Sequence, residues 1–178
     1  MQKNRERIIQ TALKALARNP MATMDQIADL VGIGRATLYR HFSSREKLIQ
    51  DLMVEAEKQF SQIVLPILND IMPAQQKLEN VVTQLIPLGA SFHFLSYEPW
   101  HSGNPEIEKA YQDQLKSWRR LIKQLKDEQV IKITISDTWI AMCLDSLIFT
   151  AWEAIHSGDI APNDAPHLVL QMFLKGIG

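Results

Sequence analysis

The sequence of 178 residues is 46% hydrophobic and 22% charged, carries a net charge of −1 and contains one cysteine, Cys143. This composition excludes a disordered chain and a collagen-like repeat, and a single cysteine excludes an internal disulfide. No apolar run approaches the roughly 20 residues that a membrane-spanning helix needs, and the charged N-terminus lacks the apolar block of a signal peptide. We therefore expect a globular cytoplasmic protein with a sizeable hydrophobic core.

The near-zero net charge conceals an uneven distribution. Residues 1–47 contain nine Lys and Arg against four Asp and Glu, a balance of +5, whereas residues 48–178 contain ten against sixteen, a balance of −6. A basic part beside an acidic part indicates two functions, one of which involves a polyanion such as DNA. The alternative is that a charge difference of this size arises by chance. The same boundary is the expected division between an N-terminal domain and a larger C-terminal domain.

Hydrophobic periodicity predicts helices along nearly the whole chain, with turns at glycine and proline. Three short helices are expected in the first 45 residues, over about 4–18, 24–31 and 35–41. Asn4 is the expected cap of the first, and Thr23 with Gln26 forms a capping box at the start of the second. The side chains expected to face inward from the second helix are Ile27, Leu30 and Val31.

A long fourth helix is expected to begin at another capping box, formed by Ser43 and Glu46, and to end or kink at Pro66. The strand-like alternation over residues 130–135 has no second strand to pair with, so we interpret it as an extended connector. The remaining predicted helices cover about 73–86, 91–97, 104–128, 136–156 and 164–176. The sequence thus predicts an all-α fold of about nine helices.

The second and third predicted helices are joined by a three-residue turn that begins with Gly32, the spacing of a helix-turn-helix unit. In such a unit the second helix holds the third against the major groove of DNA. Arg35 can hydrogen-bond guanine and Thr37 can contact a base edge, whereas Tyr39 and His41 suit phosphate oxygens. The alternative is an ordinary helical corner with a solvated basic face. The candidate DNA-contacting residues are Thr23, Gln26, Arg35, Ala36, Thr37, Tyr39, Arg40, His41, Arg45 and Lys47.

Three segments in the first quarter of the chain carry a specific pattern. They are TMDQIA over residues 23–28, GIGRATLYRHF over residues 32–42 and REKL over residues 45–48. Together these residues resemble the DNA-binding domain of TetR-family transcriptional regulators, whose hallmark is the Leu-Tyr-x-His-Phe run with the Ser-basic-Glu segment behind it. The expected number of helices and the chain length are also similar to those of the family, although the later helices carry no sharp motif.

The resemblance implies a two-fold symmetric homodimer that binds a palindromic operator and represses transcription. By correspondence with the family pattern, residues 35–37 read bases, and Tyr39 and His41 contact phosphates. The sequence departs from the pattern at Gly34, where the family often carries a capping serine. It also has Asp25 near the start of the second helix, where some members carry a basic residue, which argues against a base contact from that helix.

All four tryptophans lie in the larger C-terminal part. The resemblance implies a small-molecule pocket among the fifth to eighth helices, whose occupation shifts the fourth helix and spreads the two DNA-reading heads. Because ligand pockets are mostly apolar with a few polar groups, we expect the effector to be a small apolar or aromatic molecule. The alternative for each aromatic residue is a place in the core. The residues selected as pocket lining are Phe92, Trp118, Trp139, Met142 and Asp145.

The eighth and ninth predicted helices are the expected dimer surface, because they carry more apolar side chains along one face than the core of one domain needs to bury. The stripe on the eighth helix consists of Ile140, Leu144, Leu147, Ile148, Ala151 and Ile155, and that on the ninth of Leu168, Val169, Met172 and Phe173. The alternative is that both stripes pack inside one protomer.

The sequence offers no signal for an enzyme, a metal site or a cofactor. The five histidines lack the spacing of zinc ligands, and neither a P-loop nor a G-x-S-x-G motif occurs. Two alternatives to a ligand-responsive repressor stay open. One is a helical small-molecule-binding or enzymatic protein whose basic N-terminal unit is structural. The other is a DNA-binding regulator that activates transcription or needs no ligand.

Overall fold

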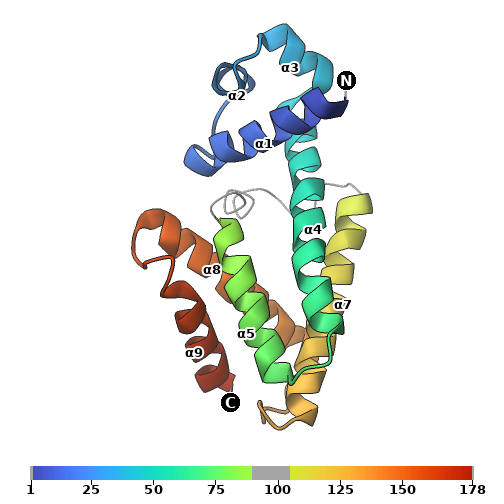
Figure 1. Ribbon diagram of the computed structural model, residues 1–178, viewed down its shortest axis with the longest axis vertical. Coiled ribbons are helices and arrows are strands. Elements are labelled where there is room, and N and C mark those ends of the chain that lie inside the picture. The colour runs from blue at the N-terminus through green and yellow to red at the C-terminus, as the bar shows by residue number, and fades with distance from the viewer. Residues whose placement is uncertain (1, 90–104, 178) are drawn as a thin grey trace.

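The computed structural model describes residues 2–89 and 105–177, which contain helices and turns but no β-strand. The elements are α1 (Gln2–Arg18), α2 (Met24–Val31), α3 (Arg35–His41), α4 (Arg45–Asn69), α5 (Ala74–Leu85), the 3-10 helix η1 (Ile86–Leu88), α7 (Pro105–Asp127), α8 (Asp137–Ser157) and α9 (Ala165–Ile177). In Figure 1, α1–α3 form one end of the molecule, and α4 runs from them into a bundle with α5, α7, α8 and α9. The predicted all-α fold is confirmed. The predicted helix over residues 91–97 lies outside the described residues.

The helix-turn-helix unit is defined by local signals at both ends of α2. The Thr23 hydroxyl accepts a hydrogen bond from the backbone N–H of Gln26, and the Gln26 side chain accepts one from the Thr23 N–H at 2.8 Å, so the predicted capping box is confirmed. Gly32 ends the helix with φ at +72°, a conformation that residues with a Cβ rarely adopt. These two signals fix the length of α2 and the direction in which α3 leaves it.

The core of this unit is built from side chains of all three short helices. Ile27 and Leu38 are fully buried, and Ile8 and Leu16 of α1 close the core from the other side. Leu30, which we expected to face inward, is 57% exposed. The expectation is wrong because an eight-residue helix buries a narrow stripe, here Met24, Ile27 and Ala28.

Two predicted helix starts differ from the structure. α1 begins at Gln2, before the expected cap at Asn4. The cap of α4 is Ser44 rather than Ser43, because Ser44 is the residue with an extended backbone, and its hydroxyl accepts from the N–H of Lys47 at 3.2 Å. Pro66 lies inside α4, which continues for three more residues, so the proline does not end the helix.

The bundle core is centred on α7 and α8. Trp118 of α7 is fully buried, and Ile140, Leu144 and Ile148 of α8 are buried in the same cluster. Most of the apolar stripe that we assigned to a dimer surface on α8 therefore lies inside the protomer. The alternative interpretation of that stripe is the right one, because α7 and α9 pack on either side of α8 and cover it.

α8 has the length and composition of a helix that could cross a membrane, which no other helix in the described parts of the chain has. The predicted absence of an apolar run of about 20 residues still holds, because Asp145 and Glu153 interrupt this helix. The same composition is normal for a core helix. In this protein, the apolar side chains of α8 at Ile140, Leu144 and Ile148 are buried against other helices.

The segment between α7 and α8 is an extended connector, as predicted. No strand is present over residues 130–135, and Ile131 is buried in the core. The ammonium group of Lys126 donates to the carbonyl of Ile135 at 2.7 Å and to the carboxylate of Asp137 at 2.6 Å. These contacts hold the connector against α7 and set the position from which α8 begins.

Candidate nucleic-acid interface and ligand site

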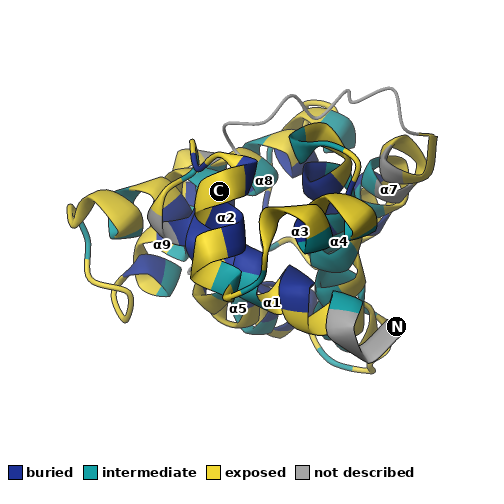
Figure 2. Ribbon diagram, turned by 90° about the horizontal axis from the view of Figure 1, so that it is seen from above, coloured by how far each residue is buried: buried dark blue, intermediate teal, exposed yellow. Residues whose placement is uncertain are grey.

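One side of α3 faces away from the rest of the molecule. Arg35, Ala36, Tyr39 and Arg40 are exposed, whereas Leu38 points into the core and fixes the rotation of the helix. Figure 2, which looks onto this end, shows exposed turns on α2 and α3 in the middle of the view. The structure therefore brings four of the ten predicted DNA-contacting side chains onto the accessible side of α3, with the N-terminus of α3 open to solvent.

Arg35 is already engaged in the free protein. Its guanidinium lies 2.9 Å from the carboxylate of Asp25 and 5.5 Å from the centre of the Tyr39 ring. Both charged side chains are more than half exposed, and ion pairs of this kind contribute little free energy. Asp25 thus holds the arginine beside the exposed face of α3 without burying it.

Other predicted contact residues have structural roles in the free protein. Thr23 and Gln26 form the capping box of α2. The guanidinium of Arg45 donates to the backbone carbonyl of Pro20 at 2.8 Å, so this residue clamps the turn between α1 and α2. Nε2 of His41 is buried and meets no hydrogen-bond partner in the described ranges 2–89 and 105–177.

Arg5 and Asp51 form a contact that the sequence did not predict. The Arg5 guanidinium donates to Asp51 at 2.6 Å and lies 5.3 Å from the centre of the Phe42 ring. Lys47 approaches the other oxygen of Asp51 at 3.1 Å. The four-residue spacing of Lys47 and Asp51 could have predicted their ion pair from the sequence. The contact of Asp51 with Arg5 could not be predicted, because it depends on how α1 packs against α4. The carboxylate ties α1 to the start of α4.

The predicted ligand-binding residues divide into separate groups. Trp118 is fully buried, and Asp145 is partly buried and accepts a hydrogen bond from the Gln114 side chain at 2.9 Å. Trp139 and Met142 are 61% and 45% exposed, so they do not join these two in the protomer. Phe92 lies outside the described residues. The structure thus brings together Trp118 and Asp145 alone among the described members of the set.

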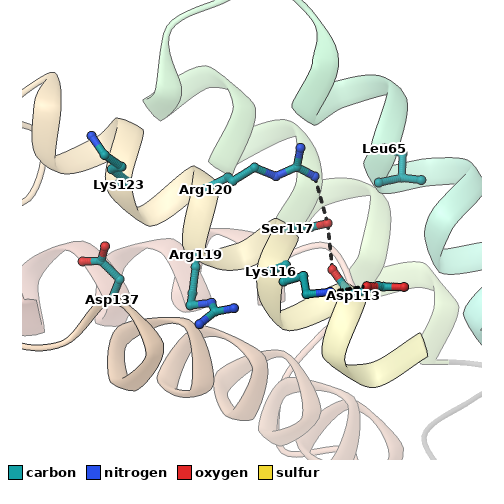
Figure 3. Close-up of a pocket in the computed structure, with 8 residues that line it drawn as sticks. All are labelled: Leu65, Asp113, Lys116, Ser117, Arg119, Arg120, Lys123 and Asp137. Atoms are coloured by element: carbon teal, nitrogen blue, oxygen red, sulfur yellow. Dashed lines mark hydrogen bonds and ion pairs between the residues drawn. The ribbon is translucent and has the colours of Figure 1, made fainter. Parts of the chain in front are cut away.

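Trp118 and Asp145 contact two residues, Phe60 and Gln114, that line a furrow between α4 and α7. The furrow has a volume of about 450 Å³ and is lined by Glu57, Phe60, Ser61, Leu65, Glu106, Lys109, Asp113, Gln114 and Ser117. A second hollow, of about 700 Å³, continues from Leu65, Asp113 and Ser117 along the outer side of α7. Figure 3 shows this second hollow, with Arg119 and Arg120 leaving α7 in different directions and Arg120 reaching toward Ser117. The two hollows have opposite character, the first acidic and the second basic.

Glu57 and Asp145 are the electrostatically unusual groups of this region. Burial raises the pKa of Glu57 to about 7, and the nearby carboxylates of Asp113 and Asp145 raise it further. Burial also raises the pKa of Asp145 to about 6, against the opposing effects of Trp118 and Gln114. The indole N–H of Trp118 is buried without a hydrogen bond of good geometry, yet it lies close enough to lower the pKa of Asp145. Two carboxyl groups therefore share one poorly solvated region.

The Asp145→Asn variant is expected to be more stable than the parent at pH 8, by about 2 kcal/mol, and to lose this advantage near pH 4. A carboxyl group whose pKa is raised by folding stabilises the protein when protonated, and this stability is lost as the pH rises through the folded-state pKa of about 6. Urea unfolding between pH 4 and pH 8 measures the difference.

Asp113→Asn is the matched control for that prediction. Asp113 lies on the exposed side of α7, and its hydrogen bond with Lys116 lowers the pKa of the carboxyl group. Its replacement should produce a small change of opposite sign. If the difference in free energy of unfolding between the parent and Asp145→Asn did not vary with pH, the pKa of Asp145 would not be raised by folding.

No group of three or more His, Cys, Asp or Glu side chains in residues 2–89 and 105–177 is arranged to hold a metal ion. Cys143 is partly buried on α8.

Comparison with known proteins gives consistent matches. The family model of bacterial regulatory proteins, tetR family, matches residues 8–52. The chain is 25% identical over 174 residues to the HTH-type transcriptional regulator NfxB of Pseudomonas aeruginosa, an alignment that covers 96% of this chain and 92% of that protein. It is 29% identical over 106 residues to the HTH-type transcriptional repressor LfrR of Mycolicibacterium smegmatis, covering 60% of this chain and 56% of that protein.

The fold is similar to that of solved regulators. The crystal structure of the TetR-like transcriptional regulator LfrR from Mycobacterium smegmatis in complex with proflavine matches with a TM-score of 0.83 at 20% identity, covering 99% of this chain and 97% of that one. The MbdR regulator from Azoarcus sp. CIB matches with a TM-score of 0.77 at 20% identity, covering 98% and 99%. The family model spans all of α2 and α3, the helices that present the exposed face described above. Residues 8–52 of this chain thus match the DNA-binding region of tetR-family bacterial regulatory proteins, and the chain as a whole has the fold of TetR-like regulators.

Proposed function

We propose that this protein is a homodimeric repressor that binds a palindromic operator through α3 and is released by a small-molecule ligand. The observation that carries the DNA-binding part is the exposed face of α3, on which Arg35, Ala36, Tyr39 and Arg40 are accessible at the N-terminal end of the molecule. Two copies of such a helix, one helical turn of DNA apart at about 34 Å, suit a two-fold symmetric site. The proposed location is the cytoplasm, and an enzymatic activity is not part of the proposal.

The proposed DNA contacts follow from side-chain accessibility. Arg35 and Thr37 read base edges, while Tyr39 and Arg40 contact phosphates. Arg45, which holds the carbonyl of Pro20, acts by positioning the unit. We propose a DNA-binding domain that includes residues 1–47, with Leu48 and Leu52 of α4 contributing to its core, since both are fully buried and lie within the stretch that the family model matches.

The proposed dimer surface is the exposed side of α8 and α9. Trp139 and Met142 of α8 and Leu168 and Met172 of α9 are large apolar side chains that remain accessible in the protomer. A second copy of the chain is the proposed occupant, because TetR-type recognition of a palindrome needs two heads in a fixed relation. In this arrangement, Trp139 and Met142 belong to the dimer interface rather than to a ligand pocket.

Met172→Glu is expected to weaken dimerisation at least 100-fold, because a carboxylate would be buried without a partner at the interface. Met172 is 64% exposed in the protomer, so the fold of the single chain should persist. Sedimentation equilibrium measures the dissociation constant, and Gln84→Glu on α5, an exposed position outside the proposed surface, is the charge-matched control. An unchanged dissociation constant of the dimer in Met172→Glu would show that the interface lies elsewhere.

The effector part of the proposal rests on the furrow between α4 and α7. Its volume of about 450 Å³ is within the usual range of ligand pockets, about 300–1,000 Å³. Glu57 and Phe60 line the furrow from the middle of α4, and Arg45 and Leu48 in its first turn belong to the DNA-binding unit. About 18 Å of continuous helix separates residues 45 and 57. A ligand that moves α4 would therefore also move the DNA-binding unit.

Electrophoretic mobility shift on the DNA upstream of the protein's own gene tests the proposed function. A sequence-specific shift is expected, with an affinity that falls steeply between 50 and 200 mM salt, because Lys and Arg side chains would replace counterions on the phosphates. The competitor is an unrelated DNA fragment of equal length. Equal binding to both fragments, or an affinity independent of salt, would reject the operator-binding regulator.

A further inference from the structure

Acidic side chains are concentrated around the furrow between α4 and α7. Glu57 lines it from α4, and Glu106 and Asp113 line it from α7. Lys109 is the cationic side chain among the described lining residues. Coulomb energy at such a site favours a positively charged ligand over a negatively charged one, most strongly where the carboxylate is shielded from water.

The two inner carboxyl groups have hydrogen-bond donors but no cation as partner. Glu57 accepts from the Ser61 hydroxyl at 3.2 Å, and Asp145 accepts from the Gln114 amide at 2.9 Å. Within residues 2–89 and 105–177, neither group forms an ion pair with Lys or Arg. Buried carboxylates without a counter-ion are costly in free energy, which is why the pKa of each is raised. A bound cation would remove this cost.

Aromatic surface lies directly beside these carboxyl groups. Phe60 lines the furrow, and its ring meets that of Trp118 edge to face, with centroids 5.6 Å apart and planes inclined at 77°. Trp118 is fully buried, and its unpartnered indole N–H lies beside Asp145 at the inner end of the site. A flat apolar face next to uncompensated negative charge is the combination that recognises aromatic cations.

We propose that the furrow binds a flat aromatic cation, with Glu57 as its counter-ion, Phe60 as its apolar contact and Asp145 as a second, deeper negative group. This inference rests on the proposed function, since it names the chemical class of the effector. Neutral aromatic molecules would gain the contact with Phe60 but not the charge pairing. Anions would be repelled by Glu57, whereas the charge of Asp113 is offset by its ion pair with Lys116 at 2.9 Å.

Isothermal titration of the full chain without DNA tests the inference, with three probes of similar size. Proflavine is the cation, acridone the neutral molecule and 1-anilinonaphthalene-8-sulfonate the anion. The parent is expected to bind proflavine at least tenfold more tightly than acridone and to bind the sulfonate most weakly. Equal affinity for proflavine and acridone, or preference for the sulfonate, would overturn the inference.

Three variants test which carboxylate is responsible for the preference for a cation. Glu57→Gln is expected to weaken proflavine binding at least tenfold and to leave acridone binding within a factor of two. Asp145→Asn should weaken proflavine binding about fivefold. Glu55→Gln carries the same change on the same helix, but Glu55 bonds Gln59 and Gln10 away from the furrow, so its proflavine affinity should match that of the parent. Unchanged proflavine binding in Glu57→Gln would exclude this carboxylate as the counter-ion.

The mobility shift of the same variants separates this inference from the proposed function. A protein that shifts its upstream DNA but shows no preference for the cation rejects the acidic site alone. A protein that binds proflavine through Glu57 but shifts no DNA rejects the regulator and leaves the site in place. Circular dichroism confirms folding, which should persist because both glutamine and asparagine remove a costly buried charge.

Discussion

Arg35→Ala is expected to lower affinity for the operator by about 10- to 100-fold and to abolish the base preference at one position of each half-site. A bidentate contact from arginine to guanine contributes about 1–3 kcal/mol of discrimination. In the free protein, this side chain is paired with Asp25 at 2.9 Å and is 67% exposed. Such a pair is weak enough to be exchanged for a base. The ion pair thus holds the arginine at the start of α3, where we propose that it reads a base.

Mobility shifts against a set of single-base operator variants measure this effect. Lys47→Ala should weaken binding to all variants by a similar factor, because a phosphate contact carries no base information. Lys175→Ala, an exposed position on α9, controls for the loss of one positive charge. If Arg35→Ala weakened binding to every variant equally, Arg35 would be a phosphate contact and the assignment of base reading to the start of α3 would be wrong.

Gly89→Ala is expected to destabilise the protein by about 3 kcal/mol, the largest effect on stability that we predict. A Cβ at this position would lie 2.2 Å from Cδ1 and 2.4 Å from Cγ of Trp152. Cγ sits next to the backbone and cannot swing away as the end of a flexible side chain can. The indole N–H also donates to the carbonyl of Leu85 at 3.2 Å, a buried hydrogen bond that a displaced ring would lose.

Urea unfolding of Gly89→Ala and Gly176→Ala provides the comparison. Gly176 lies in α9 and does not have positive φ, and no atom lies within 4 Å of the position that a Cβ would take there. Alanine at this position should therefore be neutral or stabilise the protein by up to about 1 kcal/mol. If the two variants had equal stability, the close packing of Trp152 on Gly89 would not exist in solution.

Features set by local sequence were predicted well. The Thr23 capping box and the left-handed glycine at the end of α2 are decided within a few residues, as is Gly158, which ends α8 with φ at +82°. The cap of α4 was misplaced by one residue, because two adjacent serines offer the same side chain and only the backbone conformation decides between them.

Features that depend on packing between helices were predicted less well. The stripe on α8 containing Ile140 and Leu144 has the same periodicity whether it faces another protomer or α7, and the structure buries it inside the protomer. Trp139 was selected as pocket lining for its type, yet it lies on the exposed side of the same helix. Periodicity gives the angular position of a residue on its helix but not the element that it faces.

Glu57 was absent from the predicted site, although the sequence held a signal for it. It lies four residues after Met53 and three before Phe60, in line with the buried or partly buried side chains of α4. A carboxylate in such a stripe is unusual. Its approach to Asp145 required the packing of α4, α7 and α8, which spacing along one chain does not specify.

α4 is the element that joins the two proposed activities. Its first turns contribute the buried Leu48 and Leu52 to the DNA-binding unit, and its middle contributes Glu57 and Phe60 to the furrow. The opposite charges of the two parts are consistent with this division: the excess of basic residues lies in residues 1–47, and three of the sixteen acidic residues of the remaining chain line the furrow.

The most direct test of the central claim is a hydroxyl-radical footprint of this protein on the DNA upstream of its own gene. We predict two protected regions of related sequence in opposite orientation, whose centres lie one helical turn, or a whole number of turns, apart. Uniform weak protection along the fragment, or none at protein concentrations that saturate related repressors, would contradict the claim that α3 is the DNA-reading helix of a dimeric regulator.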